Sequence, residues 1–221
     1  MSMARFITLE GGEGAGKSTQ IKLLAASFAA AGLDHIITRE PGGSAGGEAI
    51  RGLVVSGSVD RWNANTESLL FMTARYDHLE TKIKPALASG QWVLCDRFYD
   101  STYVYQGMAK NVGTAWLDQL YSHLFGNFSP HLTLLLDLSP SVGLTRADKR
   151  GNVAESRFEQ MGHDYHERIR AGFLELASAH PSRIQVVDAS QNAQAVHVAI
   201  ITAINTRFGL HLKPSSFPEF A

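Results

Sequence analysis

The residues of this chain that could do chemistry begin with a glycine-rich run near the N-terminus. Gly11-Gly12-Glu13-Gly14-Ala15-Gly16-Lys17-Ser18 matches G-x-x-x-x-G-K-[ST], with an apolar run before it and an Ala/Leu-rich run after it. Glycines let successive backbone N–H groups curl around a phosphate, and a helix that begins near Lys17 adds its positive end. Lys17 is placed to bridge β- and γ-phosphates, and Ser18 offers a hydroxyl to Mg²⁺. The run therefore predicts a nucleoside triphosphate site, and the alternative is a chance glycine-rich turn.

Glu13 places a carboxylate inside this loop. A negative charge beside a triphosphate is unfavourable unless another group offsets it. Two interpretations stay open at this point. Glu13 is either a solvated side chain that points away from the phosphates, as most glutamates are, or the acceptor for a sugar hydroxyl of a second substrate.

Further charged residues follow two other apolar runs. Arg39 opens the turn Arg39-Glu40-Pro41-Gly42-Gly43, and Asp96 and Arg97 come directly after residues 92–95. A guanidinium can fork onto a phosphate, and Arg97 can neutralise charge on a transferring phosphoryl group. An aspartate at this position commonly holds the Mg²⁺ shell, directly or through water. The alternative for each arginine is a surface ion pair.

The elements that must position these residues follow from the alternation of short apolar runs and longer amphipathic runs. We predict strands at 5–9, 35–38, 92–95, 131–138 and 183–187, and helices at 18–31, 47–55, 67–87, 114–124, 141–149, 159–179 and 193–208. This order implies βαβ units, and hence an α/β fold of the P-loop NTPase class with a five-stranded, mainly parallel sheet and helices on both faces. Ligands in such sheets sit beyond the carboxyl ends of the strands, where Gly11, Arg39 and Asp96 fall.

A locally basic, irregular stretch lies between the helices predicted at 141–149 and 159–179. It contains Arg150, Gly151 and Arg157 and follows directly on Lys149, a composition typical of a mobile lid. The alternative is a solvated connection whose basic residues keep it soluble. We place the lid at about 148–158, within one domain that covers 1–221.

The composition limits the possible functions. The 221 residues carry 20 Lys+Arg and 21 Asp+Glu, a net charge of -1, which disfavours nucleic-acid binding by bulk charge. One cysteine, Cys95, excludes a disulfide framework, and no apolar run approaches the roughly 20 residues of a membrane span. We therefore expect a cytoplasmic protein without a membrane partner.

Together these residues resemble the bacterial thymidylate kinases. The resemblance runs from residue 4 to about 208 and rests on the phosphate loop and on Thr38-Arg39-Glu40-Pro41-Gly42-Gly43, Asp96-Arg97, Tyr105-Gln106-Gly107, Arg168-Ile169-Arg170 and Asp188-Ala189. It implies the reaction ATP + dTMP → ADP + dTDP, with Mg²⁺ as cofactor, in a homodimeric cytosolic enzyme. The acceptor phosphate is already anionic, so we expect direct in-line transfer without a covalent enzyme intermediate.

The resemblance also implies roles for single positions. The implied ATP-binding residues are Gly11, Gly12, Glu13, Gly14, Ala15, Gly16, Lys17, Ser18, Thr19 and, beside the adenine, Arg146. The implied dTMP-binding residues are Glu13, Arg39, Glu40, Phe71, Arg75, Arg97, Ser101, Tyr105 and Gln106. Among them Glu13 would meet the 3′-hydroxyl, Arg39 and Arg97 the phosphate, Phe71 the face of thymine, and Arg75 its O4. Ser18 and Asp96 would hold the Mg²⁺.

Gly14 marks a departure within the family, because some thymidylate kinases carry a catalytic arginine at this position of the loop. The arrangement common in bacteria supplies arginines from the lid, and the candidates here are Arg150 and Arg157. Transition-state charge needs a cation, and a loop without one must recruit it by closing. We therefore expect Lys17, Arg97, Arg150 and Arg157 to be the catalytic cations.

Other interpretations remain open. The nearest is a deoxynucleoside kinase or a different nucleoside monophosphate kinase of the P-loop class. A GTPase-type switch is a more distant one, since its guanine-selecting Asn-Lys-x-Asp is not found in the chain. His163, His166 and Glu167 could suggest a helical metal face, but their spacing of three and the single acid that follows favour a solvated helix face.

Overall fold

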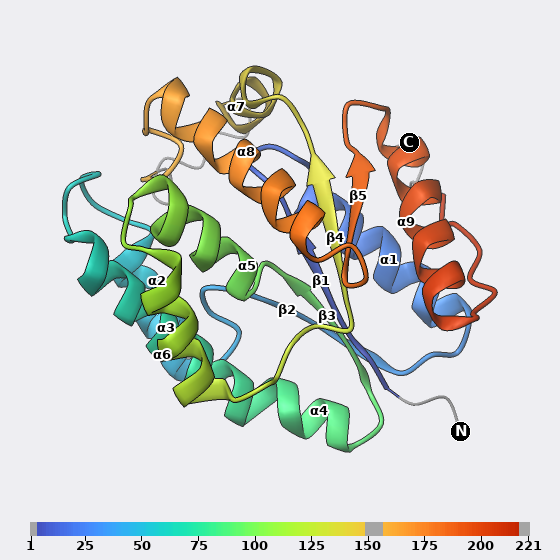
Figure 1. Ribbon diagram of the computed structural model, residues 1–221. Coiled ribbons are helices and arrows are strands. Elements are labelled where there is room, and N and C mark those ends of the chain that lie inside the picture. Colours follow the sequence, from blue (N-terminus) through green and yellow to red (C-terminus); the bar gives the residue numbers. More distant parts are fainter. Residues whose placement is uncertain (1–3, 149–156, 217–221) are drawn as a thin grey trace.

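A five-stranded parallel sheet forms the centre of the computed structural model, which describes residues 4–148 and 157–216 (Figure 1). The strands are β1 (Phe6–Glu10), β2 (His35–Arg39), β3 (Trp92–Asp96), β4 (Leu132–Asp137) and β5 (Ile184–Asp188), in the order β2-β3-β1-β4-β5. All neighbouring strands in this sheet pair in parallel. The central strand β1 is buried at every position, as expected for a strand covered on both faces. The predicted fold class is confirmed.

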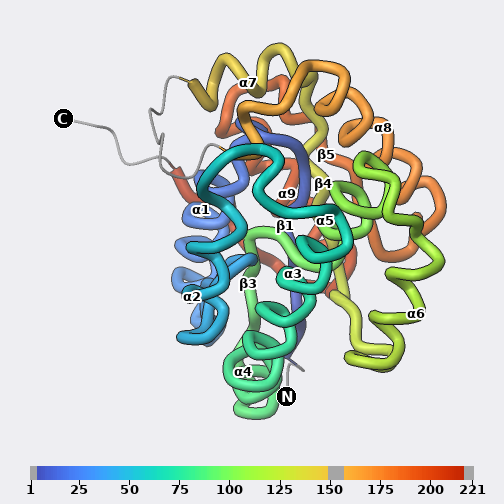
Figure 2. The backbone as a smooth tube through the Cα atoms, turned by 90° about the vertical axis from the view of Figure 1, so that its left-hand side faces the viewer, coloured from blue at the N-terminus to red at the C-terminus, as the bar shows by residue number. Residues whose placement is uncertain are grey.

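Helices cover both faces of the sheet. They are α1 (Lys17–Ala30), α2 (Ala45–Val54), α3 (Ala64–His78), α4 (Lys84–Ala88), α5 (Tyr99–Thr102), α6 (Thr114–Phe125), α7 (Pro140–Asp148), α8 (His163–Ala179) and α9 (Ala193–Phe208). Figure 1 shows α1 and α9 on one side, where they share a core cluster with the strands, and α5, α6 and α8 on the other. In Figure 2, α3 runs on into α4 through the π-helical turn Leu79–Ile83.

Side-chain caps set the starts of α2 and α3. The Ser44 hydroxyl accepts from the Gly47 N–H at 3.1 Å, and the Asn63 carboxamide oxygen accepts from the Thr66 N–H at 2.8 Å. The two helices consequently begin at Ala45 and Ala64, earlier than the predicted starts at 47 and 67. The earlier starts matter for the site, because α3 carries Phe71 and Arg75.

The segment after β3 is helical, which the sequence did not predict. Here α5 continues into a π-helical segment, Tyr103–Ala109. Its aromatic and β-branched residues have low helix propensity, so tertiary contacts with α8 and α3 must stabilise it. The site residues Ser101, Thr102, Tyr105 and Gln106 lie on it.

The lid prediction falls mostly outside the described residues, since 149–156 are not among them. Arg150 and Lys149 belong to that part. After it, Arg157–Gln160 form a turn, and α8 begins at His163 rather than at the predicted 159. In the described part of the chain, no helix is long and apolar enough to cross a membrane.

Candidate active site

The phosphate loop joins the end of β1 to the start of α1. Gly16 precedes the helix with φ 93°, a conformation that glycine adopts without strain. Lys17 folds back over the loop and donates from Nζ to the carbonyl oxygens of Gly11 at 3.0 Å and Gly12 at 2.8 Å. Burial and the nearby Arg97 charge lower the pKa of Lys17 to about 8. The ammonium is thus held at the mouth of the loop, where a bound phosphate would meet it.

Gly14 and Gly143 bring this loop into direct backbone contact with α7. A Cβ on Gly14, which has φ 69°, would lie 1.9 Å from the Gly143 carbonyl oxygen. A Cβ on Gly143 would lie 2.3 Å from the Glu13 carbonyl oxygen. Neither position has room for a side chain, so the loop has no space for an arginine at Gly14.

Ser18, in the first turn of α1, meets Asp96, the last residue of β3. The Ser18 hydroxyl donates to Asp96 Oδ2 at 3.0 Å. A hydroxyl and a carboxylate are hard oxygen donors, which suit Mg²⁺. Within residues 4–148 and 157–216, no group of three or more His, Cys, Asp or Glu side chains gathers as a metal site. The pair therefore fits a cation that takes its remaining ligands from water and phosphate oxygens.

Arg97 follows β3 in a left-handed conformation, φ 69°, which is strained for a residue other than glycine. Its Nη1 donates to the Gly11 carbonyl oxygen at 2.9 Å and to Ser101 Oγ at 3.0 Å, and its Nη2 donates to Glu13 Oε1 at 2.9 Å. The Tyr105 hydroxyl donates to the same Glu13 oxygen at 2.9 Å. Arg97 is thereby aimed at the space in front of the phosphate loop.

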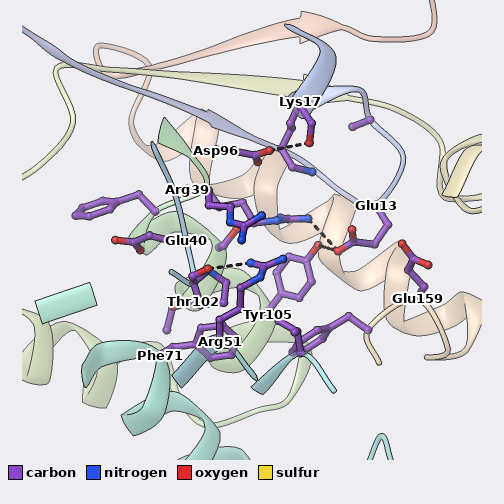
Figure 3. A pocket seen from close by; sticks show the side chains of 18 of the residues that line it. Glu13, Lys17, Arg39, Glu40, Arg51, Phe71, Asp96, Thr102, Tyr105 and Glu159 are labelled. Atoms are coloured by element: carbon purple, nitrogen blue, oxygen red, sulfur yellow. Dashed lines mark hydrogen bonds and ion pairs between the residues drawn. The ribbon is translucent and has the colours of Figure 1, made fainter. Parts of the chain in front are cut away.

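Glu13 turns into the site rather than away from it (Figure 3). Burial opposes its ionisation, but the charges of Arg97 and Lys17 and the Tyr105 hydroxyl outweigh burial and lower the pKa of Glu13 to about 2. The side chain is therefore a carboxylate and a pure hydrogen-bond acceptor over the whole range of ordinary pH.

Glu10, the last residue of β1, binds Ser101, which in turn accepts a hydrogen bond from Arg97. Glu10 was not among the residues predicted from the sequence. Its carboxylate accepts from the Phe98 N–H at 2.8 Å and from the Ser101 hydroxyl at 2.6 Å. Burial, then the nearby Asp100 charge, raises the pKa of Glu10 to about 7. A carboxylate that ends an otherwise apolar strand was the available signal, because a buried acid must find partners.

A buried polar chain lies on the far side of the cleft. Arg75 donates from Nε to Glu40 Oε2 at 2.7 Å and from Nη1 to Thr102 Oγ1 at 3.1 Å. His78 joins this chain through Nδ1, 3.0 Å from Glu40 Oε1, and through Nε2, 2.6 Å from Thr38 Oγ1. The chain links the end of β2 with α3 and α5. It fixes the Arg75 guanidinium, which is 2 % exposed.

These parts open onto one cleft of about 380 Å³. Figure 3 shows Lys17 and Asp96 at one end and Phe71 and Arg51 at the other. The predicted residues that line the cleft are Glu13, Gly14, Ala15, Gly16, Lys17, Ser18, Arg39, Glu40, Phe71, Arg75, Asp96, Arg97, Ser101, Tyr105 and Gln106. A second hollow, of about 300 Å³, lies on the other side of the loop against Thr19, Arg146 and Asn192.

Comparison with known proteins agrees with this arrangement. The family model described as thymidylate kinase matches residues 9–200. The thymidylate kinase of Caulobacter vibrioides is 52% identical over 210 residues, which are 95% of this chain and 100% of that protein. The one from Ruegeria pomeroyi is 48% identical and covers 91% of this chain and 94% of its own. The crystal structure of the Ehrlichia chaffeensis thymidylate kinase aligns with a TM-score of 0.73 at 29% identity, over 91% of this chain and 98% of the other.

The chain belongs to the thymidylate kinase family.

Membership of the thymidylate kinase family confirms the predicted family and activity, a nucleotide kinase that phosphorylates dTMP. The other P-loop classes considered from the sequence are set aside by it. The roles of single residues stay predictions, and the structure adds their surroundings. Arg39 lies at the cleft but is half exposed, and it pairs with Glu48 at 3.1 Å. Arg146 donates to the Ala189 carbonyl oxygen at 3.3 Å beside the second hollow.

Arg157, predicted as a catalytic lid residue, does not line the cleft. Its guanidinium is buried and pairs with Glu67 Oε2 through Nη1 at 2.6 Å. The prediction of a phosphate contact therefore has no support from the position of this side chain. The neighbouring Phe158 and Glu159 do line the cleft, as do Arg51 and Thr102, none of which was among the predicted site residues.

Arg51 has the clearest signal among the residues that sequence reasoning missed. It lies on α2 and donates from Nη1 to the Pro41 carbonyl oxygen at 2.8 Å, so it packs against the turn that follows Arg39. The signal is its place in the sequence. Arg51 is a basic residue in the helix that follows the Arg-Glu-Pro-Gly-Gly turn, so it is expected on the same side of the sheet as that turn. The two histidines considered for a metal face diverge, since His166 is buried while His163 is exposed and lies 3.7 Å from Glu167.

Proposed function

We propose that this chain transfers the γ-phosphoryl group of ATP to dTMP in one in-line step, with Mg²⁺ bound at Ser18 and Asp96. One observation carries the proposal: the phosphate loop and the buried Arg75–Glu40 chain open onto the same cleft of about 380 Å³, with Arg97 between them. A donor phosphate on the loop and an acceptor on the other side would face each other across Arg97.

The loop side of the cleft suits ATP. Backbone N–H groups of Gly14–Ser18 and the start of α1 favour phosphate oxygens, and Lys17 is the adjacent cation. The second hollow, beside Thr19 and Arg146, provides the space for the adenosine end. When bound, Mg²⁺ would neutralise charge on the phosphates, and Ser18 and Asp96 would orient it.

The opposite side of the cleft suits dTMP. Phe71 supplies an aromatic face for thymine, and the guanidinium of Arg75 lies nearby for O4. Arg39, Arg51 and Arg97 are the cations of this side that suit the acceptor phosphate. Glu13 is the acceptor for the 3′-hydroxyl, and Glu40 holds Arg75. Ser101, Tyr105 and Gln106, from the helical segment after β3, close the pocket.

The cations for the transition state are Lys17 and Arg97, together with an arginine from the lid. The closed position at Gly14 supports a lid contribution, because the loop cannot carry its own arginine. Arg150 remains the candidate, and it lies outside the described residues. Arg157, the other predicted lid arginine, has its guanidinium buried against Glu67 and is not placed for this role.

We infer a homodimer from the exposed apolar residues of α3 and α6, which lie side by side. Leu69, Tyr76, Trp116 and Leu124 are each more than a third exposed. Light scattering on the purified chain and on a Leu69→Glu variant tests this, because a monomer in both cases would contradict it. The cytoplasmic location stays a prediction from composition.

A coupled ADP-release assay over a panel of nucleoside monophosphates and deoxynucleosides tests the activity. We expect turnover with dTMP, weaker turnover with dUMP, and none with thymidine. One methyl group is worth only about 1–3 kcal/mol, so the ratio of dTMP to dUMP should fall between roughly tenfold and 200-fold. Turnover with thymidine but not with dTMP would support a deoxynucleoside kinase instead.

A further inference from the structure

Arg157 uses all three nitrogens of its guanidinium on protein partners. Nε donates to the Ser58 carbonyl oxygen at 2.9 Å, Nη1 to Val54 at 3.0 Å, and Nη2 to Val59 at 2.9 Å. Nη1 also lies 2.6 Å from Glu67 Oε2. The residue is 2 % exposed. Its charge is thus neutralised within the protein, in the manner of a structural cation rather than of one that waits for a phosphate.

Glu67 is the centre to which Arg157 binds. It lies in the first turn of α3 and is fully buried. Its Oε1 accepts from Gln106 Nε2 at 2.8 Å and from Lys110 Nζ at 2.7 Å. The Glu67–Arg157 pair therefore links α3 and the helical segment after β3, through Glu67, to the α2–α3 connection and the turn before α8, through Arg157.

The cluster of Glu67, Arg157, Gln106 and Lys110 lies directly behind one wall of the cleft. Phe158, the residue after Arg157, lines the cleft with its ring centroid 6.2 Å from that of Phe71 and 5.9 Å from that of Tyr105. The Arg157 guanidinium lies 5.2 Å from the Phe158 ring centroid. Gln106, held by Glu67, also lines the cleft. The position of this wall therefore depends on the Glu67–Arg157 pair.

We propose that Glu67 and Arg157 are positioning residues, which together hold Phe158 and Gln106 against the nucleobase end of the cleft. Arg157 then contributes to binding of the acceptor nucleotide and not to neutralisation of phosphate charge. The proposal rests on the proposed dTMP side of the site. Loss of Arg157 should then raise the KM for dTMP and leave kcat nearly unchanged, whereas loss of a catalytic lid arginine would lower kcat.

Steady-state kinetics of Arg157→Met, Glu67→Gln and the double variant provide the test. We expect each single change to raise the KM for dTMP by about tenfold, the size of effect expected from one lost charged hydrogen bond. The kcat and the KM for ATP should stay within about threefold of wild type. Because both changes break the same pair, the double variant should be no worse than the more severe single variant.

Arg157→Lys distinguishes positioning of the cleft wall from neutralisation of phosphate charge. A lysine keeps the charge but cannot reach three carbonyl oxygens at once, so the KM for dTMP should stay high in this variant. If Arg157 instead acted on phosphates, Lys would restore much of the turnover lost in Arg157→Met. Arg207→Met, at an exposed position of α9, is the matched control for loss of an arginine and should behave as wild type.

Two results would overturn the proposal. The first is a fall in kcat of roughly 100-fold or more in Arg157→Met, with unchanged KM for dTMP and normal kinetics in Glu67→Gln, because that is the signature of a group at developing charge. The second is unchanged kinetics in variants that are folded.

If Arg157→Met fails to fold, as judged by circular dichroism, the Glu67→Gln and Arg157→Lys variants decide by the same criteria. Failure of the wild-type chain to phosphorylate dTMP would instead refute the proposed function, and dTMP binding by calorimetry to the wild type and the variants would then test this wall alone.

Discussion

Arg97 Nη2 and Glu13 Oε1 lie 2.9 Å apart, and this ion pair joins the residue after β3 to the loop after β1. The Tyr105 hydroxyl shares the same carboxylate oxygen. The second Glu13 oxygen is not engaged by either group. A carboxylate fixed in this way can accept a hydrogen bond from a sugar hydroxyl without losing its contact with Arg97.

Glu13→Gln should reduce recognition of the 3′-hydroxyl of dTMP. We expect the wild type to prefer dTMP over 3′-deoxy-dTMP in kcat/KM, and the variant to lose about tenfold of that preference, since a charged acceptor is replaced by a neutral one. Parallel kcat/KM measurements with both nucleotides check this. An unchanged ratio would leave Glu13 without the proposed role. Because the pKa of Glu13 is about 2, the wild-type preference should not vary between about pH 5 and 9.

Lys17→Ala should lower kcat by roughly 100-fold or more, the usual cost of one preorganised group at developing charge. The Lys17 ammonium is the cation that the loop holds over its own carbonyl oxygens. Lys22→Ala, at an exposed position of the same helix, is the matched control and should be unaffected. Near wild-type turnover in Lys17→Ala would contradict in-line transfer from this loop.

Asp96→Asn should raise the Mg²⁺ concentration needed for half-maximal rate by about 10- to 100-fold, because the hydroxyl of Ser18 and the Asp96 carboxylate form the proposed cation site. The rate at saturating Mg²⁺ should recover in part. Asp164→Asn, on the exposed first turn of α8, removes an equal charge away from the site. Identical Mg²⁺ titrations for wild type and Asp96→Asn would exclude this cation site.

Glu10→Gln should change how stability depends on pH. Burial, then Asp100, raises the pKa of Glu10 from 4.5 to about 7, so the folded state binds this proton more tightly than the unfolded state. The contribution of Glu10 is therefore fully present below pH 4.5 and is lost as the pH rises through about 7. Relative to wild type, the free energy of unfolding of Glu10→Gln should increase as the pH rises from about 4.5 to 8. Urea unfolding at several pH values measures it, and parallel curves would disprove it.

Gly143→Ala should displace the phosphate loop, because a Cβ there would lie 2.3 Å from the Glu13 carbonyl oxygen. A misplacement near 1 Å can cost about 100-fold in rate, so we expect kcat to fall by about tenfold or more. Gly52→Ala is the matched control, since its Cβ meets nothing within 4 Å on α2. It should leave the kinetics unchanged and stabilise the fold by about 0.5–1 kcal/mol. Equal kcat values in Gly143→Ala and Gly52→Ala would contradict this, because they would show that the backbone accommodates the added Cβ without displacing the phosphate loop.

The parts of the site that the sequence predicted are those whose signal is local. The phosphate loop is one contiguous motif, and Arg39 and Asp96 each follow an apolar run, so the parallel sheet alone brings them to one edge. The strands could be predicted from the apolar runs alone, because β1 and its neighbours β3 and β4 are almost entirely buried. The starts of α2 and α3 were placed too late, because they depend on the side-chain caps at Ser44 and Asn63.

The parts that could not be predicted depend on partners distant in the chain. Glu67 and Arg157 are 90 residues apart, and nothing near either residue indicates that they pair. The helical segment after β3 has aromatic and β-branched residues that argue against a helix, and contacts with α8 override that preference. The support of Arg97 by Glu10 likewise joins two strand ends through Ser101.

The contact between Gly14 and Gly143 has a consequence for how such a sequence can diverge. A side chain at Gly14 would meet the backbone of α7 at 1.9 Å, which no rotamer can avoid. No single substitution can therefore move this chain toward relatives that carry an arginine in the loop. Helix α7 must first shift away. Among homologues we expect position 143 and position 14 to vary together, with arginine at the second only where the helix stands further from the loop.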